Sequence, residues 1–171
     1  MASGSAEIEG FSELYERMVG DRPFLGSLLT GHLAIEFLLG RLIAQYDVKL
    51  AQHAETLRHR ALIALNHEIG TIDEAQRDVL VSINRIRNKL AHEITFEPSL
   101  HEMRQLWGAA SAAFDDLTDG ISQGIEALAS AAAFDQVEGW VCSELFVQIC
   151  YDLHEEYVRR GGDVEAFMAR P

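Results

Sequence analysis

Apolar residues recur along most of the chain at the three- and four-residue spacing of amphipathic helices, and no long stretch alternates as a strand would. Prolines occur only at positions 23, 98 and 171, and a Gly-Gly pair stands at 161–162. Proline favours the first turn of a helix, and glycine favours its end. The pattern predicts six helices, at about residues 11–19, 23–46, 54–69, 77–92, 98–133 (with a break at 120–124) and 135–160. Thr71 or Asp73 is expected to cap the fourth of these helices at its N-terminal end.

These helices belong in one domain. A chain of 171 residues with 48% hydrophobic content is long enough for one core and short for two. The predicted fold is therefore all-α, a single-domain helical bundle of five to six helices across residues 1–171. Residues 1–22 are expected to form a peripheral N-terminal segment, and residues 161–171 a tail.

Location and redox state follow from a few residues. The most apolar run, residues 24–46, is interrupted by His32, Glu36 and Arg41, which favours a core helix over a membrane span. The chain opens without a secretory signal pattern, so we expect a cytoplasmic protein with no membrane partner. Cys142 and Cys150 lie eight residues apart in one predicted helix, about 12 Å along its axis, which is too far for a disulfide.

Charge limits the possible partners. The formal net charge is −13, and the two halves of the chain differ. Residues 1–92 hold ten Lys and Arg against twelve Asp and Glu, whereas residues 93–171 hold four against fifteen. Nonspecific binding to a nucleic-acid backbone needs a basic surface. Any nucleic-acid contact must therefore be local and is expected in the first half, while the acidic second half forms a solvated face or a docking surface for a basic partner.

Two short motifs are excluded as sites. Residues 120–124, "GISQG", match the string of a hydrolase nucleophile elbow, but that elbow needs a preceding strand and this flank is polar and helical. Four His-Glu pairs occur, and none is followed by a second histidine at zinc-binding spacing. The sequence thus predicts neither a dedicated metal site nor a cofactor. The four histidines of these pairs are His67, His92, His101 and His154.

The fourth predicted helix, residues 77–92, has a polar face beside its apolar one. At 100° per residue, Arg87 lies at the edge of the apolar stripe, and Asn84, Asn88 and His92 lie progressively further from it. The apolar stripe consists of Val79, Ile83, Ile86 and Leu90. The residues expected to point into solvent are Arg85 and Lys89.

This polar face has a structural and a chemical interpretation. A cation or histidine at a helix C-terminus stabilises the helix dipole by about 0.3–1 kcal/mol, so such residues are common there. The same groups could act on phosphate: an imidazole exchanges protons near neutral pH, and a guanidinium neutralises developing charge. Asn88, one turn before His92, could orient the ring. A single helix lacks a second acid or base.

The string "RNKLAH", residues 87–92, resembles the signature of the all-helical HEPN superfamily: an arginine, a polar residue directly after it, and a histidine separated from the arginine by four to six residues. Arg87, Asn88 and His92 match it with a gap of four. The wider string "INRIRNKLAHE" is similar to the branch that includes the mannitol operon repressor family. The resemblance covers residues 20–160 in outline and about six residues specifically. The toxins of HEPN–nucleotidyltransferase pairs carry a tyrosine two residues after the histidine, where this chain has Ile94.

The resemblance implies two kinds of function. In the first, the chain is a metal-independent RNA endonuclease of toxin or antiviral defence type, a homodimer that cuts single-stranded RNA with Arg87, Asn88 and His92 as catalytic residues. It could then have an antitoxin or regulatory protein partner. In the second, it is a non-catalytic regulator of the mannitol-repressor kind, or a helical adaptor, that works through protein contacts. Whether the chain is an enzyme stays open, with the endoribonuclease favoured.

Glu36 and Asn84 are the supporting residues of this hypothesis. Asn84 belongs to the polar face of residues 77–92, and Glu36 is a carboxylate on an otherwise apolar helix, where a partner is needed. Glu36 could pair with Arg87 and hold it in place. Equally, it could bond to His32, one turn earlier, or reach solvent.

Overall fold

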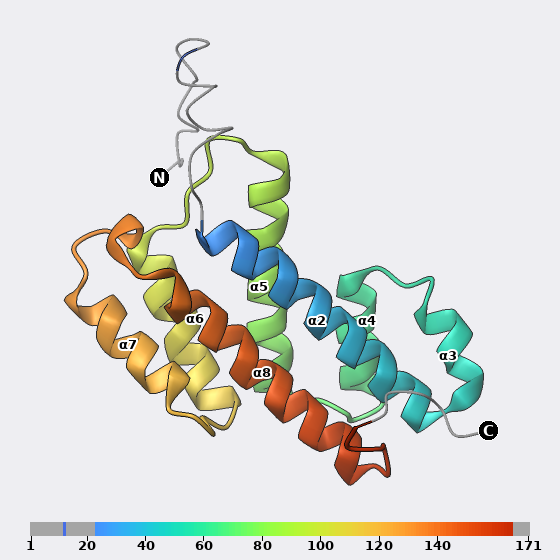
Figure 1. Cartoon of the computed structure of the whole chain (residues 1–171). Coiled ribbons are helices and arrows are strands. Elements are labelled where there is room, and N and C mark those ends of the chain that lie inside the picture. Colours follow the sequence, from blue (N-terminus) through green and yellow to red (C-terminus); the bar gives the residue numbers. More distant parts are fainter. Residues whose placement is uncertain (1–11, 13–22, 166–171) are drawn as a thin grey trace.

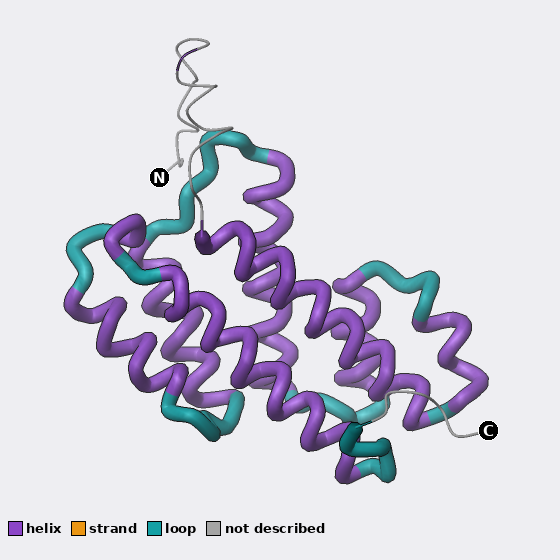
Figure 2. The backbone as a smooth tube through the Cα atoms, in the orientation of Figure 1, coloured by secondary structure: helices purple, strands orange, loops and turns teal. Residues whose placement is uncertain are grey.

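The computed structural model describes residue 12 and residues 23–165. Within that part of the chain it contains seven α-helices, one short 3-10 helix and no strand, which confirms the predicted all-α bundle (Figures 1 and 2). The helices are α2 (Pro23–Tyr46), α3 (Val48–Ala54), α4 (His59–Glu68), α5 (Glu74–His92), α6 (Leu100–Ala113), α7 (Gly120–Ser130) and α8 (Gly139–Arg159). The 3-10 helix is η1 (Phe134–Gln136). The helix predicted at 11–19 lies outside the described residues, apart from Ser12.

Helix α2 is the centre of the bundle. It packs against α8 along its length and also contacts α3, α4 and α5, and Figure 1 shows α2 and α8 running side by side in front of α5. By length and composition alone the segment Phe24–Tyr46 could also cross a membrane. The buried side chains of α2 account for much of that apolar character, because they form the core with the neighbouring helices. They include Leu28, Ile35, Leu38, Leu39, Leu42 and Ile43.

The close approach of α2 and α8 depends on Gly31. A Cβ atom at this position would lie 2.1 Å from Cγ of Phe146, well inside van der Waals contact. Gly31 is buried, and Phe146 of α8 fills the space that a larger residue would occupy. The absence of a side chain at Gly31 therefore sets the spacing of this helix pair.

Most helix ends follow the chemistry expected from the sequence. The carboxylate of Asp73 and the side chain of Gln76 form a reciprocal capping box at the start of α5, and Ser99 and Glu102 do the same for α6. Helix α8 ends at Arg159, and Gly161 just beyond it has a φ of 94°, the left-handed conformation that glycine tolerates. The predicted starts near residues 73 and 98–99 and the stop at the Gly-Gly pair are confirmed.

Four predicted boundaries were wrong. The third predicted helix begins at His59 instead of residue 54. Residues 48–54 form the separate helix α3, because the carboxylate of Asp47 accepts a hydrogen bond from the Lys49 amide and starts a new helix. The fifth predicted helix breaks at residues 114–119, before Gly120. The carboxylate of Asp116 accepts hydrogen bonds from the backbone amides of Ile121 and Ser122 and so caps α7. The last long helix begins at Gly139 instead of 135, after η1.

A candidate polar site between helices α2, α4 and α5

Helix α5 presents the two faces predicted from its sequence. Val79, Ile83 and Ile86 are buried, and Leu90 is half-buried against the core. Arg85 is exposed, as expected. The prediction for Lys89 was wrong: it is half-buried, with its ammonium 4.9 Å from the centroid of the Phe96 ring. The chain after α5 folds back under this side chain, which gives the Lys89 cation an aromatic face.

The motif residues occupy the last turns of α5. Arg87 is half-buried, whereas Asn88 and His92 are exposed. The Arg87 guanidinium donates through Nη1 to Oδ1 of Asn88 at 3.2 Å, and its Nε is buried with no hydrogen-bond partner in the described part of the chain. Asn88 therefore contacts Arg87, and these described residues show no hydrogen bond from Asn88 to His92. Within one chain the predicted trio presents one histidine to solvent at the end of a helix.

A second polar group lies beneath this helix, between α2, α4 and α5. His32 and Glu36 come from consecutive turns of α2, His59 is the first residue of α4, and Asn84 comes from α5. Nε2 of His32 lies 3.4 Å from Oδ1 of Asn84, and the rings of His32 and His59 stack with centroids 3.8 Å apart. Both histidines are buried. Two sequence-predicted supporting residues, Glu36 and Asn84, thus take part in one cluster.

The partner of Glu36 is histidine. Oε2 of Glu36 lies 3.3 Å from Nδ1 of His59 and 4.0 Å from Nδ1 of His32. No ion pair within 4.0 Å joins Glu36 to Arg87, although both side chains are among the described residues. Of the two interpretations that the sequence allowed, the geometry favours pairing with histidine, and the Glu36 side chain is also 39% exposed to solvent.

The protonation of the two histidines follows from their surroundings. Burial lowers the pKa of His59 to about 3, and the neighbouring His32 and Arg87 charges act in the same direction. Burial also lowers the pKa of His32; the contact with Asn84 and the Glu36 carboxylate oppose this effect, while Arg87 adds to it. Both rings are therefore held toward the neutral state. Neither ring nitrogen of His59 has a hydrogen bond within the described residues, although one lies close to Glu36.

His59 was missed by the sequence analysis. Its neighbours along the chain carry no motif, and only the fold brings the start of α4 against α2. A partial signal existed at His32 and Glu36, whose four-residue spacing places both on one helical face. The "GISQG" string at residues 120–124 is helical: Gly120 opens α7, and Ser122 is an exposed helical residue. The flank at residues 115–119, which was expected to be helical, forms a turn instead.

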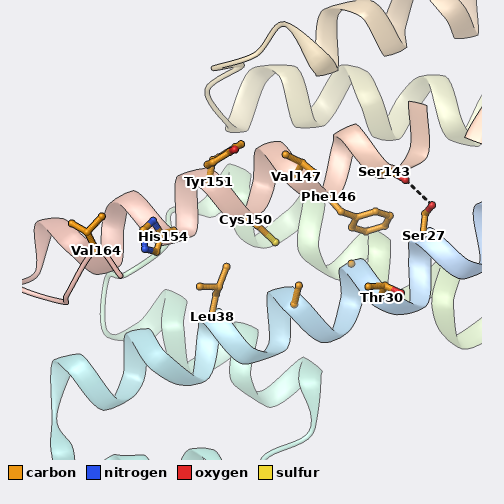
Figure 3. Close-up of a pocket in the computed structure, with 12 residues that line it drawn as sticks. Ser27, Thr30, Leu38, Ser143, Phe146, Val147, Cys150, Tyr151, His154 and Val164 are labelled. Carbon is orange, nitrogen blue, oxygen red and sulfur yellow. Dashed lines mark hydrogen bonds between the residues drawn. The ribbon is translucent and has the colours of Figure 1, made fainter. Parts of the chain in front are cut away.

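A separate apolar groove of about 530 Å³ runs between α2 and α8 (Figure 3). Ser27 and Ser143 share a hydrogen bond of 2.9 Å at one end of it, and His154 and Val164 lie toward the other. None of the predicted site residues lines this groove. The polar cluster and the groove are therefore different features of α2.

Both cysteines of α8 are free thiols, and burial raises the pKa of Cys142 to about 12 and of Cys150 to about 11.

In comparisons with known proteins, no protein-family model, no curated protein and no solved structure matches this chain significantly.

Proposed function

We propose that this chain is a metal-independent endoribonuclease of the HEPN type that acts as a homodimer on single-stranded RNA. The observation that carries the proposal is the position of the Arg87–Asn88–His92 motif. It occupies the C-terminal end of α5, with His92 exposed and Arg87 half-buried five positions before it. A solvent-facing imidazole can carry protons, and a guanidinium on the same end of the helix can bind phosphate.

In this mechanism the ribose 2′-hydroxyl attacks the adjacent phosphorus. An imidazole takes the 2′-hydroxyl proton as the new oxygen–phosphorus bond forms. The bond from phosphorus to the 5′-oxygen then breaks, and a protonated imidazole gives that oxygen a proton. The products are a cyclic phosphate end and a 5′-hydroxyl end. Arg87 neutralises the charge that develops on the phosphoryl oxygens.

Two imidazoles are needed, and a second copy of the chain would supply the other. A stripe on the outer face of α2 supports dimer formation: Leu33 is 65% exposed, Phe37 is 48% exposed, and Leu29 continues the stripe. Apolar side chains gathered on one helix face are typical of protein contacts. Leu33 and Phe37 directly follow His32 and Glu36 in sequence, so the stripe runs beside the polar cluster that contacts α5.

The net charge of −13 favours the second candidate, a non-catalytic regulator or adaptor that works through protein contacts. RNA would meet a repulsive field over most of such a surface. Only the endoribonuclease would produce cleaved RNA with cyclic phosphate ends. An RNA oligonucleotide pool and DNA of the same sequences, incubated with the protein in EDTA, distinguish them.

We expect RNA cleavage to survive chelation and to yield cyclic phosphate ends, with the DNA left intact because it lacks the 2′-hydroxyl. DNA cut as readily as RNA would exclude the mechanism. Intact RNA in every condition would favour the regulator.

A further inference from the structure

We propose that His32, Glu36 and His59 form a binding site for a divalent transition-metal ion, with Zn²⁺ as the expected ion. The three side chains offer two imidazole nitrogens and one carboxylate oxygen whose ligand atoms all lie within 4.8 Å of one another. Two histidines and a carboxylate are a common ligand set of protein zinc sites with an open position. The proposal does not rest on the proposed ribonuclease activity: none of Arg87, Asn88 and His92 is among the ligands, and Glu36 is shared only as a supporting residue.

The distances fit a zinc ion. Ligands at about 2.0–2.1 Å from a tetrahedral zinc lie roughly 3.3–3.4 Å from each other. Oε2 of Glu36 and Nδ1 of His59 are already 3.3 Å apart, and Nδ1 of His32 lies 4.0 Å from the same oxygen. Nδ1 of His32 must therefore come less than 1 Å closer to the carboxylate, and the ligand nitrogens of the two histidines, which lie within 4.8 Å of each other, must also reach this separation.

The ligand side chains are held by the bundle. His32 and His59 are 5% and 6% exposed, and each comes from a helix of the core. Both ring nitrogens of His59 are buried without a hydrogen bond within the described residues, which leaves this imidazole short of a partner. Asn84 contacts the other nitrogen of His32, the kind of outer contact that orients a metal-bound histidine. Glu36 is half-exposed and gives an ion a path from solvent.

Two features of the cluster oppose the binding of a metal ion. The rings of His32 and His59 stack at an angle of 26°, so their nitrogen lone pairs lie in nearly parallel planes. For both lone pairs to point at one ion, the rings must rotate about the soft χ2 torsion. The Arg87 guanidinium acts on both histidines and repels a cation. The Glu36 carboxylate offsets that repulsion. Removal of the Arg87 charge should consequently strengthen metal binding.

The test is a calorimetric titration of ZnCl2 into protein that has been treated with EDTA and desalted, together with thermal unfolding. We expect one Zn²⁺ per chain and a rise in Tm of about 5–10 °C at a hundredfold excess over Kd. Mg²⁺ should have no effect, because it prefers oxygen ligands. Co²⁺ should give the visible absorption of a nitrogen- and oxygen-ligated ion.

Variants locate the site. Glu36→Gln, which keeps size and hydrogen bonding, and His59→Gln should each weaken Zn²⁺ binding at least about tenfold, and Arg87→Gln should strengthen it. His101→Ala, at an exposed position of α6, is the matched control and should bind as the wild type does. Absence of Zn²⁺ binding by the wild type would overturn the proposal. Equal binding by the wild type, Glu36→Gln and His59→Gln would also overturn it, and circular dichroism verifies that these variants are folded.

Discussion

The imidazole rings of His32 and His59, twenty-seven positions apart in the chain, stack face to face with their centroids 3.8 Å apart beneath helix α5. The contact joins α2 to the first residue of α4, and Glu36 lies beside both rings. Arg87 of α5 lowers the pKa of both histidines, so the polar cluster and the motif helix are electrostatically coupled. Several consequences of this arrangement can be measured.

The stability of the metal-free protein should fall as the pH drops below about 6.5. In the unfolded chain His59 takes up a proton near its ordinary pKa of 6.5, whereas the folded protein resists protonation until about pH 3. The unfolded state therefore binds more protons in this window, which costs at most about 1.4 kcal/mol per pH unit. Urea unfolding between pH 7 and 4.5 in EDTA measures the slope. His59→Gln should reduce it, and an unchanged slope would show that His59 titrates normally.

Gly31→Ala should destabilise the bundle by about 1–3 kcal/mol, because the new methyl group would overlap Phe146. Gly40→Ala is the matched control on the same helix. A Cβ there would meet nothing within 4 Å, so the better helix propensity of alanine should stabilise the protein by up to about 1 kcal/mol. Thermal unfolding of both variants checks the prediction, which fails if they shift Tm in the same direction.

Ile83→Ala should cost about 2–5 kcal/mol, because this fully buried side chain of α5 leaves a cavity in the core. Arg87→Ala on the same helix should cost at most about 1 kcal/mol, since its guanidinium makes one half-exposed hydrogen bond to Asn88 and its Nε is unpartnered. Denaturant unfolding compares the two. A loss of several kcal/mol in Arg87→Ala would mean that Arg87 is part of the structural core.

The proposed homodimer should depend on the exposed stripe of α2. Light scattering at tens of micromolar protein should give the mass of two chains, and Leu33→Glu should convert the protein to monomers by placing a charge in the interface. Val48→Glu is the control: Val48 is 71% exposed at the start of α3, away from the stripe, and should leave the dimer intact. A wild-type monomer at these concentrations would count against a composite site.

Local signals made much of the fold predictable. Proline at position 23, the Asp73 capping residue and the Gly-Gly stop each act on their own turn of helix, so the bounds of α2, the start of α5 and the end of α8 follow from neighbouring residues. The break before α7 escaped prediction because it depends on Asp116, whose carboxylate reaches forward to two amides.

Some residues of the candidate site can likewise be found from the sequence, and others only from the fold. Arg87, Asn88 and His92 are visible in the sequence because one helix holds all three. The partnership of Glu36 with His59 was invisible, because it is created when α4 packs on α2 and brings together residues without a shared local pattern. The same limit explains why the sequence predicted no metal site. Ligand spacing along one helix is visible in a sequence, whereas the proposed ligands His32, Glu36 and His59 come from two helices.

The most direct test of the central claim compares the wild type, His92→Ala and His101→Ala on single-stranded RNA in EDTA, with folding and oligomeric state verified for each. His92 and His101 are both exposed and both followed by glutamate, so only their places in the fold distinguish them. Loss of a general acid or base typically lowers the rate 10²–10⁴-fold. We expect a loss of that size in His92→Ala and wild-type cleavage in His101→Ala. RNA cleavage that is absent from the wild type, or that persists undiminished in His92→Ala, would refute the proposed mechanism.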